Sequence, residues 1–122
     1  MADEAKAARN EAFRQRTQAA ALRVIKLYQQ LPRSGEAEVI GKQLLRSATS
    51  VAANYRASCR ARSGPEYFAK LCICVEEADE TQFWLELLSQ AGIVSVNRLE
   101  EILLEYSAIT AILTTARKLA SK

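Results

Sequence analysis

The residues that break helices are few in this chain, and they gather at three places. The 122 residues include only four glycines and two prolines. Apart from Gly41, all of them lie within positions 32–35, at 64–65 and at 92. Glycine and proline mark turns and helix ends far more often than helix interiors. The chain therefore divides into four segments of similar length.

Each segment repeats apolar or small residues at alternating spacings of three and four, which is typical of a helix with a bundle-type core face. In the second segment these residues are Ile40, Leu44, Ser47, Val51, Asn54 and Ser58. In the third they are Phe68, Leu71, Val75, Ala78, Gln82, Leu85 and Ser89. The pattern predicts a single all-α domain over residues 1–122, an antiparallel up-down-up-down four-helix bundle. We place its helices at approximately 5–31, 36–62, 65–91 and 96–120.

Capping signals support these boundaries. Ser63 precedes Gly-Pro-Glu66, which combines a side-chain acceptor, a proline at the first turn and a glutamate for a capping box. Gly92 suits a left-handed turn after the third helix. The fourth helix has two candidate caps, Asn97 and Ser95. On the second helix, Asn54 occupies an expected core position, where a polar residue more often fixes register than binds a ligand.

The third and fourth helices are too apolar for a bundle with one solvated side. The stretch 71–75 is apolar on every face, and 83–84 and 102–104 extend beyond the core stripe. A helix that is apolar all round must be covered on both sides, which favours self-association over a monomer with a broad core stripe. The residues predicted for this oligomer interface are Leu71, Ile73, Phe83, Trp84, Leu103 and Leu104.

Positive charge is concentrated in the first half of the chain. Residues 1–62 hold 12 Lys and Arg against 5 Asp and Glu, a balance of +7, whereas residues 63–122 hold 5 against 9, a balance of −4. No acid occurs from 39 to 65. A stripe at 42, 46, 49, 53, 56 and 60 runs two residues out of phase with the core, about 200° away. Cations on this stripe, after it and on the first helix are the candidate nucleic-acid contacts: Lys42, Arg46, Arg56, Arg60, Arg62, Arg23 and Lys26.

Two functions fit this basic stripe equally well. A positive face is the electrostatic mark of RNA or DNA backbone binding, and it predicts a nucleic-acid adaptor. The third helix, however, carries Glu76, Glu77, Asp79, Glu80 and Glu86. Basic and acidic helices could instead pair within the bundle, between subunits or with a protein partner. Both interpretations stay open at this point.

An enzyme is not expected. The chain has no histidine, so the usual general base and the commonest transition-metal ligand are missing. Cys72 and Cys74 point to nearly opposite sides of a helix and do not form a zinc pair. We therefore expect no catalytic residues, metal or cofactor. The three cysteines read as thiols that are mostly buried, and the absence of a membrane span or signal-peptide pattern predicts a cytoplasmic protein.

Several runs resemble one bacterial family. They are QLLRSATSVAAN at 43–54, RS at 62–63, EYF at 66–68 and EEADETQFWLELL at 76–88. They resemble the four-helix-bundle proteins whose founding members are encoded in intervening sequences of 23S rRNA genes. The resemblance covers roughly residues 20–120, and the spaced polar residues of 43–54 are its most specific part.

The resemblance implies a small antiparallel bundle that assembles into a homopentameric ring. The family is also similar to the accessory variability protein of diversity-generating retroelements, a basic pentamer that binds reverse transcriptase and nucleic acid. This kinship implies RNA, DNA or a reverse-transcriptase-like protein as partners. The chain departs from many members after Asn54, where Tyr55-Arg-Ala-Ser58 replaces a small apolar pair followed by Glu-Gly. The replacement makes this stretch more basic.

Overall fold

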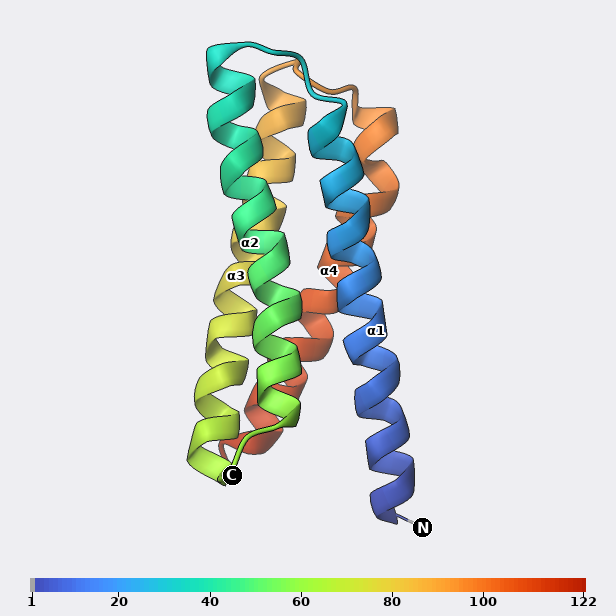
Figure 1. The fold of residues 1–122 in the computed structure, drawn as a ribbon, viewed down its shortest axis with the longest axis vertical. Coiled ribbons are helices and arrows are strands. Elements are labelled where there is room, and N and C mark those ends of the chain that lie inside the picture. The colour runs from blue at the N-terminus through green and yellow to red at the C-terminus, as the bar shows by residue number, and fades with distance from the viewer. Residues whose placement is uncertain (1) are drawn as a thin grey trace.

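The computed structural model describes residues 2–122, which form four α-helices joined by short connections. The helices are α1 (Ala2–Gln29), α2 (Gly35–Cys59), α3 (Gly64–Gln90) and α4 (Val96–Ala120). Each runs antiparallel to the one before it (Figure 1). The described residues contain no strand, so the predicted all-α up-down-up-down bundle is confirmed. None of these helices is long and apolar enough to cross a membrane.

The helix ends differ from the prediction mainly at α1 and α2. After Gln29, the backbone hydrogen bonds span three residues instead of four, from Gln30 N to Leu27 O and from Leu31 N to Tyr28 O. Pro32 follows, and a residue before proline is disfavoured in the helical region. α2 ends at Cys59 rather than 62, because the chain must turn to reach the cap of α3.

The predicted cap of α3 is present. The Ser63 hydroxyl accepts a hydrogen bond from the Glu66 amide at 3.2 Å, with Pro65 in the first turn. Gly92 has a φ of 71°, the left-handed turn expected after α3. Of the two candidates before α4, Ser95 holds the cap position, but its side chain makes no capping hydrogen bond.

The core contains one apolar face from each helix, together with a few small hydroxyl residues. Its largest fully buried side chains include Tyr106, Leu44, Leu85 and Leu99. The buried polar residues are Thr17, Ser47, Ser58 and Thr81. The predicted small positions Ser47 and Ser58 are therefore in the core, as the spacing of α2 indicated.

The core face of α3 is rotated relative to the prediction. Its buried residues are Leu71, Cys74, Ala78, Thr81, Leu85 and Leu88. The expected positions Val75, Gln82 and Ser89 are only half-buried. Because residues 71–75 are apolar on every side, hydrophobic spacing alone leaves the phase of this helix ambiguous.

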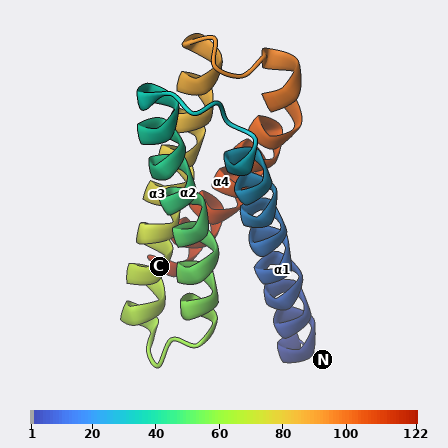
Figure 2. The same ribbon diagram turned by 45° about the horizontal axis from the view of Figure 1, so that its top comes forward.

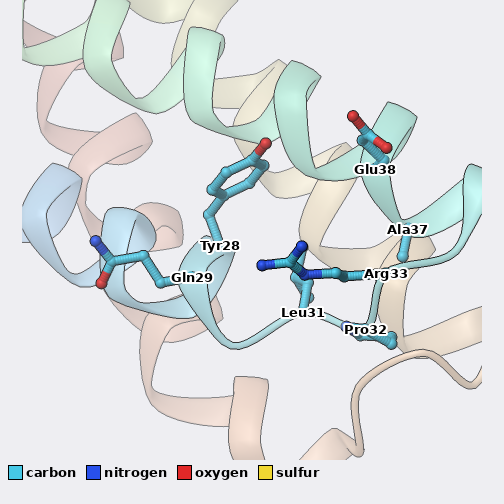
Figure 3. Close-up of a pocket in the computed structure, with 7 residues that line it drawn as sticks. All are labelled: Tyr28, Gln29, Leu31, Pro32, Arg33, Ala37 and Glu38. Atoms are coloured by element: carbon cyan, nitrogen blue, oxygen red, sulfur yellow. The ribbon is translucent and has the colours of Figure 1, made fainter.

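Close packing at the α1–α2 connection depends on Gly41, which is buried beside the end of α1. A Cβ at this position would lie 2.7 Å from Leu31 Cδ1 and 3.0 Å from a ring carbon of Tyr28. Both side chains also line a hollow of about 420 Å³ together with Arg33 and Glu38 (Figure 3). Gly41 thus sets how closely α1 and α2 approach.

The four helices are not packed equally closely. α2 and α3 are in the most extensive contact, and α1 and α4 in the least. The amino-terminal half of α1 diverges from the other helices in both views (Figures 1 and 2). Residues 3–9 are all exposed. The most extensive helix–helix contact is therefore that of the α2–α3 pair, which carries the basic stripe.

Candidate nucleic-acid interface

The predicted orientation of the α2 stripe agrees with the structure. Its six positions are all exposed: Lys42, Arg46, Thr49, Ala53, Arg56 and Arg60. The core positions of the same helix are buried on the opposite side. An exposed cation is free to bind a phosphate only if no carboxylate of the protein already holds it. The cations of the stripe differ in this respect.

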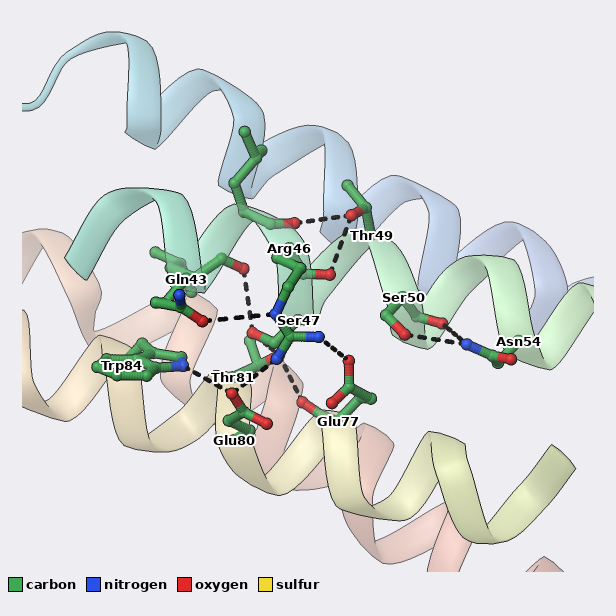
Figure 4. A network of polar contacts seen from close by, with 12 residues as sticks. Gln43, Arg46, Ser47, Thr49, Ser50, Asn54, Glu77, Glu80, Thr81 and Trp84 are labelled. Carbon is green, nitrogen blue, oxygen red and sulfur yellow. Dashed lines mark hydrogen bonds and ion pairs between the residues drawn. The ribbon is translucent and has the colours of Figure 1, made fainter. Parts of the chain in front are cut away.

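Arg46 is bound within the subunit. Its guanidinium reaches across to α3, with Nη1 at 2.8 Å from Glu77 and Nη2 at 2.7 Å from Glu80 (Figure 4). Gln43 accepts from Arg46 Nε at 3.4 Å, and the Trp84 ring nitrogen donates to Glu80 at 3.3 Å. One cation and two carboxylates thus form an ion-pair network between α2 and α3. We therefore remove Arg46 from the predicted phosphate-binding residues.

The pKa values of this network follow from its contacts. Hydrogen bonds to Glu77 and Glu80 raise the pKa of Arg46. Partial burial raises the pKa of Glu80, but hydrogen bonds from Trp84 and Arg46 outweigh burial and bring the pKa below its ordinary value. The charged forms of both groups are therefore favoured in the folded protein.

Asn54 is not a core residue, contrary to the spacing-based prediction. It is half-buried, and its Nδ2 donates to the Ser50 carbonyl oxygen at 3.0 Å and to the Ser50 hydroxyl at 2.9 Å. The next residue, Tyr55, is buried in the core and packs edge-on against Phe13. The hydrogen bonds of the Asn54 side chain therefore stay within its own helix.

Other predicted cations have loose partners at the surface. Lys42 lies 3.0 Å from Glu38, one turn away, and both side chains are more than half exposed. Arg62 lies 3.4 Å from Glu66. Exposed pairs of this kind contribute little to stability, so these cations can exchange their carboxylates for another anion at little cost.

Arg56 and Arg60 have no ion-pair partner among the described residues. They line a hollow of about 390 Å³ where the end of α2 meets the start of α3. The other lining residues are Ala53, Ala57, Glu66 and Lys70. Lys70 is likewise without an ion pair in the part of the chain that the structure describes. Three cations therefore converge around a small-residue floor with one carboxylate nearby.

Sequence reasoning missed Lys70 because it is an isolated charge on the more acidic half of the chain. The short loop between Cys59 and Gly64 gives the signal that could have found it. A short connection makes antiparallel neighbours of two helices, which brings the second turn of α3 beside the last turn of α2.

Arg23 and Lys26 of α1 do not join this surface, although Arg14 of the same helix lines a hollow with Arg56. Arg23 and Lys26 line a separate hollow between α1 and α4, together with Arg98. The predicted basic face of the first two helices therefore does not include Arg23 and Lys26. Because the core positions of α1 fix its rotation, Arg23 and Lys26 are directed toward α4, and α2 faces the other side of the helix.

The predicted oligomer interface is also divided by burial. Leu71 is fully buried within its own subunit, so it cannot contact another subunit and its prediction as an interface residue is wrong. Trp84 and Leu103 are half-buried and pack against the core. The remaining three are exposed, at 38% for Ile73, 50% for Phe83 and 66% for Leu104.

The cysteines are all thiols in this structure, but only one is fully buried. Cys74 is buried, Cys72 is intermediate and Cys59 is exposed, which corrects the expectation that most are buried. Burial raises the pKa of Cys74 to about 12. Within residues 2–122, no three His, Cys, Asp or Glu side chains gather where they could hold a metal ion.

A family model for the 23S rRNA-intervening sequence protein matches residues 9–115. The chain belongs to this family. A solved structure from Bacteroides thetaiotaomicron is 32% identical, with a TM-score of 0.83. It covers 89% of this chain and 97% of its own, and it is described as a protein of unknown function from the S23 ribosomal protein family. No curated protein matches the chain.

The residues that carry the resemblance to the 23S rRNA-intervening sequence family lie mostly in the α2–α3 contact. Gln43, Arg46, Glu77, Glu80 and Trp84 form the network of Figure 4. In this chain, the most specific part of the family pattern therefore joins two helices. The unpaired cations of the α2–α3 hollow lie outside that pattern.

Proposed function

We propose that this protein is a non-enzymatic, oligomeric adaptor of the cytoplasm that binds the phosphate backbone of RNA or DNA. Arg56, Arg60 and Lys70 contact the phosphates, and Arg62 contributes at the edge of the same surface. The observation that carries the proposal is the convergence of three cations without ion-pair partners on one hollow.

The floor of the hollow suits a backbone contact. Ala53 and Ala57 are small, so a phosphate can approach α2 closely while the longer side chains surround it. No aromatic side chain lines the hollow on which a base could stack. Binding is therefore expected to be insensitive to sequence and similar on RNA and DNA.

A titration of labelled structured RNA and duplex DNA at about 50 and 200 mM salt tests this function. Three phosphate contacts release about three counterions, so affinity for duplex DNA falls roughly 40-fold over this range for each engaged subunit. The Arg56→Glu/Arg60→Glu variant is expected to abolish binding. Lys6→Glu/Lys118→Glu, which reverses two exposed charges elsewhere, is the matched control and retains most of it.

A second candidate keeps the same cations but gives them a protein partner. Glu76 and Asp79 of α3 are exposed and have no ion pair in the described chain, so they could receive the cations of a neighbouring subunit. On this hypothesis, Arg56→Glu/Arg60→Glu dissociates the oligomer, and reversal of the acidic residues restores it. Light scattering on the variants separates the two functions, because the nucleic-acid adaptor keeps its mass.

A further inference from the structure

A second basic hollow lies between the end of α1 and the start of α4. These helix ends are at the opposite end of the bundle from the α2–α3 loop (Figure 1). It measures about 290 Å³ and is lined by Arg23, Lys26, Leu27, Gln30, Arg98 and Ile102. No carboxylate is among these residues. Three cations thus surround a small space that the nucleic-acid proposal above does not use.

The charges in this α1–α4 hollow are poorly neutralised. Arg98 Nη2 donates to the Gln30 amide oxygen at 2.7 Å, and this neutral partner orients the guanidinium without cancelling its charge. Lys26 has no ion pair among the described residues. Arg23 forms an ion pair with Glu101 at 3.7 Å, whose side chain is 92% exposed. The Glu105 carboxylate lies near enough for Arg23 to lower its pKa, but its hydrogen bonds go to Arg16.

Arg16, on the same side of α1, shows the difference that a carboxylate makes. Its Nε and Nη2 bind both oxygens of Glu105, at 2.9 and 2.8 Å. The hydrogen bond to Arg16 lowers the pKa of Glu105 despite its partial burial. A two-point partner of this kind is what the α1–α4 hollow lacks, and a phosphate group offers the same paired oxygens.

The floor of the hollow is apolar. Ile102 is only 6% exposed, and Leu27 is half-buried and packs against the core. Inorganic phosphate has no apolar surface to bury against these side chains, whereas a ligand that also carries a flat ring can bury that ring against them. The Gln30 amide nitrogen has no partner within residues 2–122 and can donate to a ring acceptor.

We propose that the α1–α4 hollow binds a nucleoside monophosphate. Arg98, Lys26 and Arg23 contact the phosphate, and the base lies against Ile102 and Leu27. This site is separate from the α2–α3 hollow in position and in chemistry, because it combines cations with an apolar floor. It goes beyond the nucleic-acid function and does not depend on it.

Calorimetric titration of the full chain with AMP, ribose 5-phosphate, adenosine and inorganic phosphate tests the site. AMP is expected to bind most tightly, since it alone uses both the cations and the floor. The Lys26→Gln/Arg98→Gln variant loses two charged hydrogen bonds and is expected to bind AMP at least tenfold more weakly. Lys6→Gln/Lys118→Gln removes the same charge elsewhere and should leave AMP affinity unchanged.

A second readout locates the ligand. In a nitrogen-labelled sample, the side-chain amide signal of Gln30 is expected to shift with AMP at concentrations where adenosine, which lacks the phosphate that the cations bind, leaves it in place. The proposal is overturned if AMP does not bind, if it binds no better than ribose 5-phosphate, or if the Lys26/Arg98 variant binds it normally. Arg56→Glu/Arg60→Glu must leave AMP binding intact, so failure of the nucleic-acid function and failure of this site give different results.

Discussion

The Thr81 hydroxyl of α3 donates a 2.9 Å hydrogen bond to the Ser47 hydroxyl of α2 inside the bundle core. Ser47 in turn donates to the Leu44 carbonyl oxygen at 3.1 Å. Both side chains are fully buried. Two small residues therefore bring α2 and α3 together and satisfy their own polar groups, where larger apolar side chains would hold the helices apart.

Enlarging Ser47 should destabilise the fold. Ser47→Leu forces a branched side chain into a closely packed contact and is expected to cost about 1–3 kcal/mol of unfolding free energy. Ser47→Ala keeps the space and should cost less, since Thr81 can still donate to the Glu77 carbonyl oxygen at 2.8 Å. Urea denaturation of both variants measures the difference. Equal stability of Ser47→Leu and Ser47→Ala would show that the contact is not tightly packed.

Removal of one buried hydroxyl should have the opposite effect. The Tyr106 hydroxyl is buried and has no hydrogen-bond partner in the described part of the chain. A buried donor without a partner costs about 1–3 kcal/mol, so Tyr106→Phe is expected to raise the unfolding free energy by about 1 kcal/mol. Thermal unfolding measures it. Tyr106→Ala, which empties the same core position, should instead lose about 3–5 kcal/mol, and a loss of stability in Tyr106→Phe would contradict the prediction.

The Arg46 network should make stability depend on pH. The pKa of Glu80 lies below its ordinary value of 4.5, so its contribution is present above pH 4.5 and is lost as pH falls through the lower folded value. Arg46→Gln is expected to cost about 1 kcal/mol at pH 7, at the upper end for exposed ion pairs because one guanidinium serves two carboxylates.

The difference between wild type and Arg46→Gln should then narrow as the pH falls below 4.5, where Glu80 gains a proton. Urea midpoints from pH 7 to pH 3 provide the measurement. Lys42→Gln is the control, because its pair with Glu38 is more exposed and should contribute less to stability than the Arg46 network. A difference that stays constant with pH would mean that Arg46 acts through packing of its stem.

Gly35 and Gly41, both in α2, differ in how much room each has for a Cβ atom. A Cβ at Gly35 would meet nothing within 4 Å, whereas one at Gly41 would come within 2.7 Å of Leu31. Gly35→Ala should stabilise the protein by up to about 1 kcal/mol, because alanine lowers the conformational entropy of the unfolded chain. Gly41→Ala should lower stability by about 1–3 kcal/mol, because Leu31 and Tyr28 must move. If both variants gained stability, the end of α1 would not be closely packed on α2.

Sequence reasoning reached the fold because few residues of this chain break helices, and hydrophobic spacing then located the core face of α2 except at Asn54. It failed on the phase of α3, where residues 71–75 are apolar all round. It could not tell that Arg46 is neutralised within the subunit and Arg56 is not, since both belong to one exposed stripe. Lys70 and Arg98 could not be predicted as site residues, because each becomes part of a basic hollow only through cations on a neighbouring helix.

Self-association through α3 and α4 is the remaining prediction. Phe83 lies about two turns before the end of α3, and Leu104 about two turns after the start of α4, so the antiparallel pair brings both to a similar height. Both are at least half exposed, at 50% and 66%, which is costly in water and favours a covered surface. Phe83→Ser/Leu104→Ser is expected to lower the mass measured by light scattering to that of a monomer. Val39→Ser/Val96→Ser removes two apolar side chains that are each 63% exposed elsewhere, and it should keep the oligomer. A mass that is the same for both double variants would remove Phe83 and Leu104 from the interface.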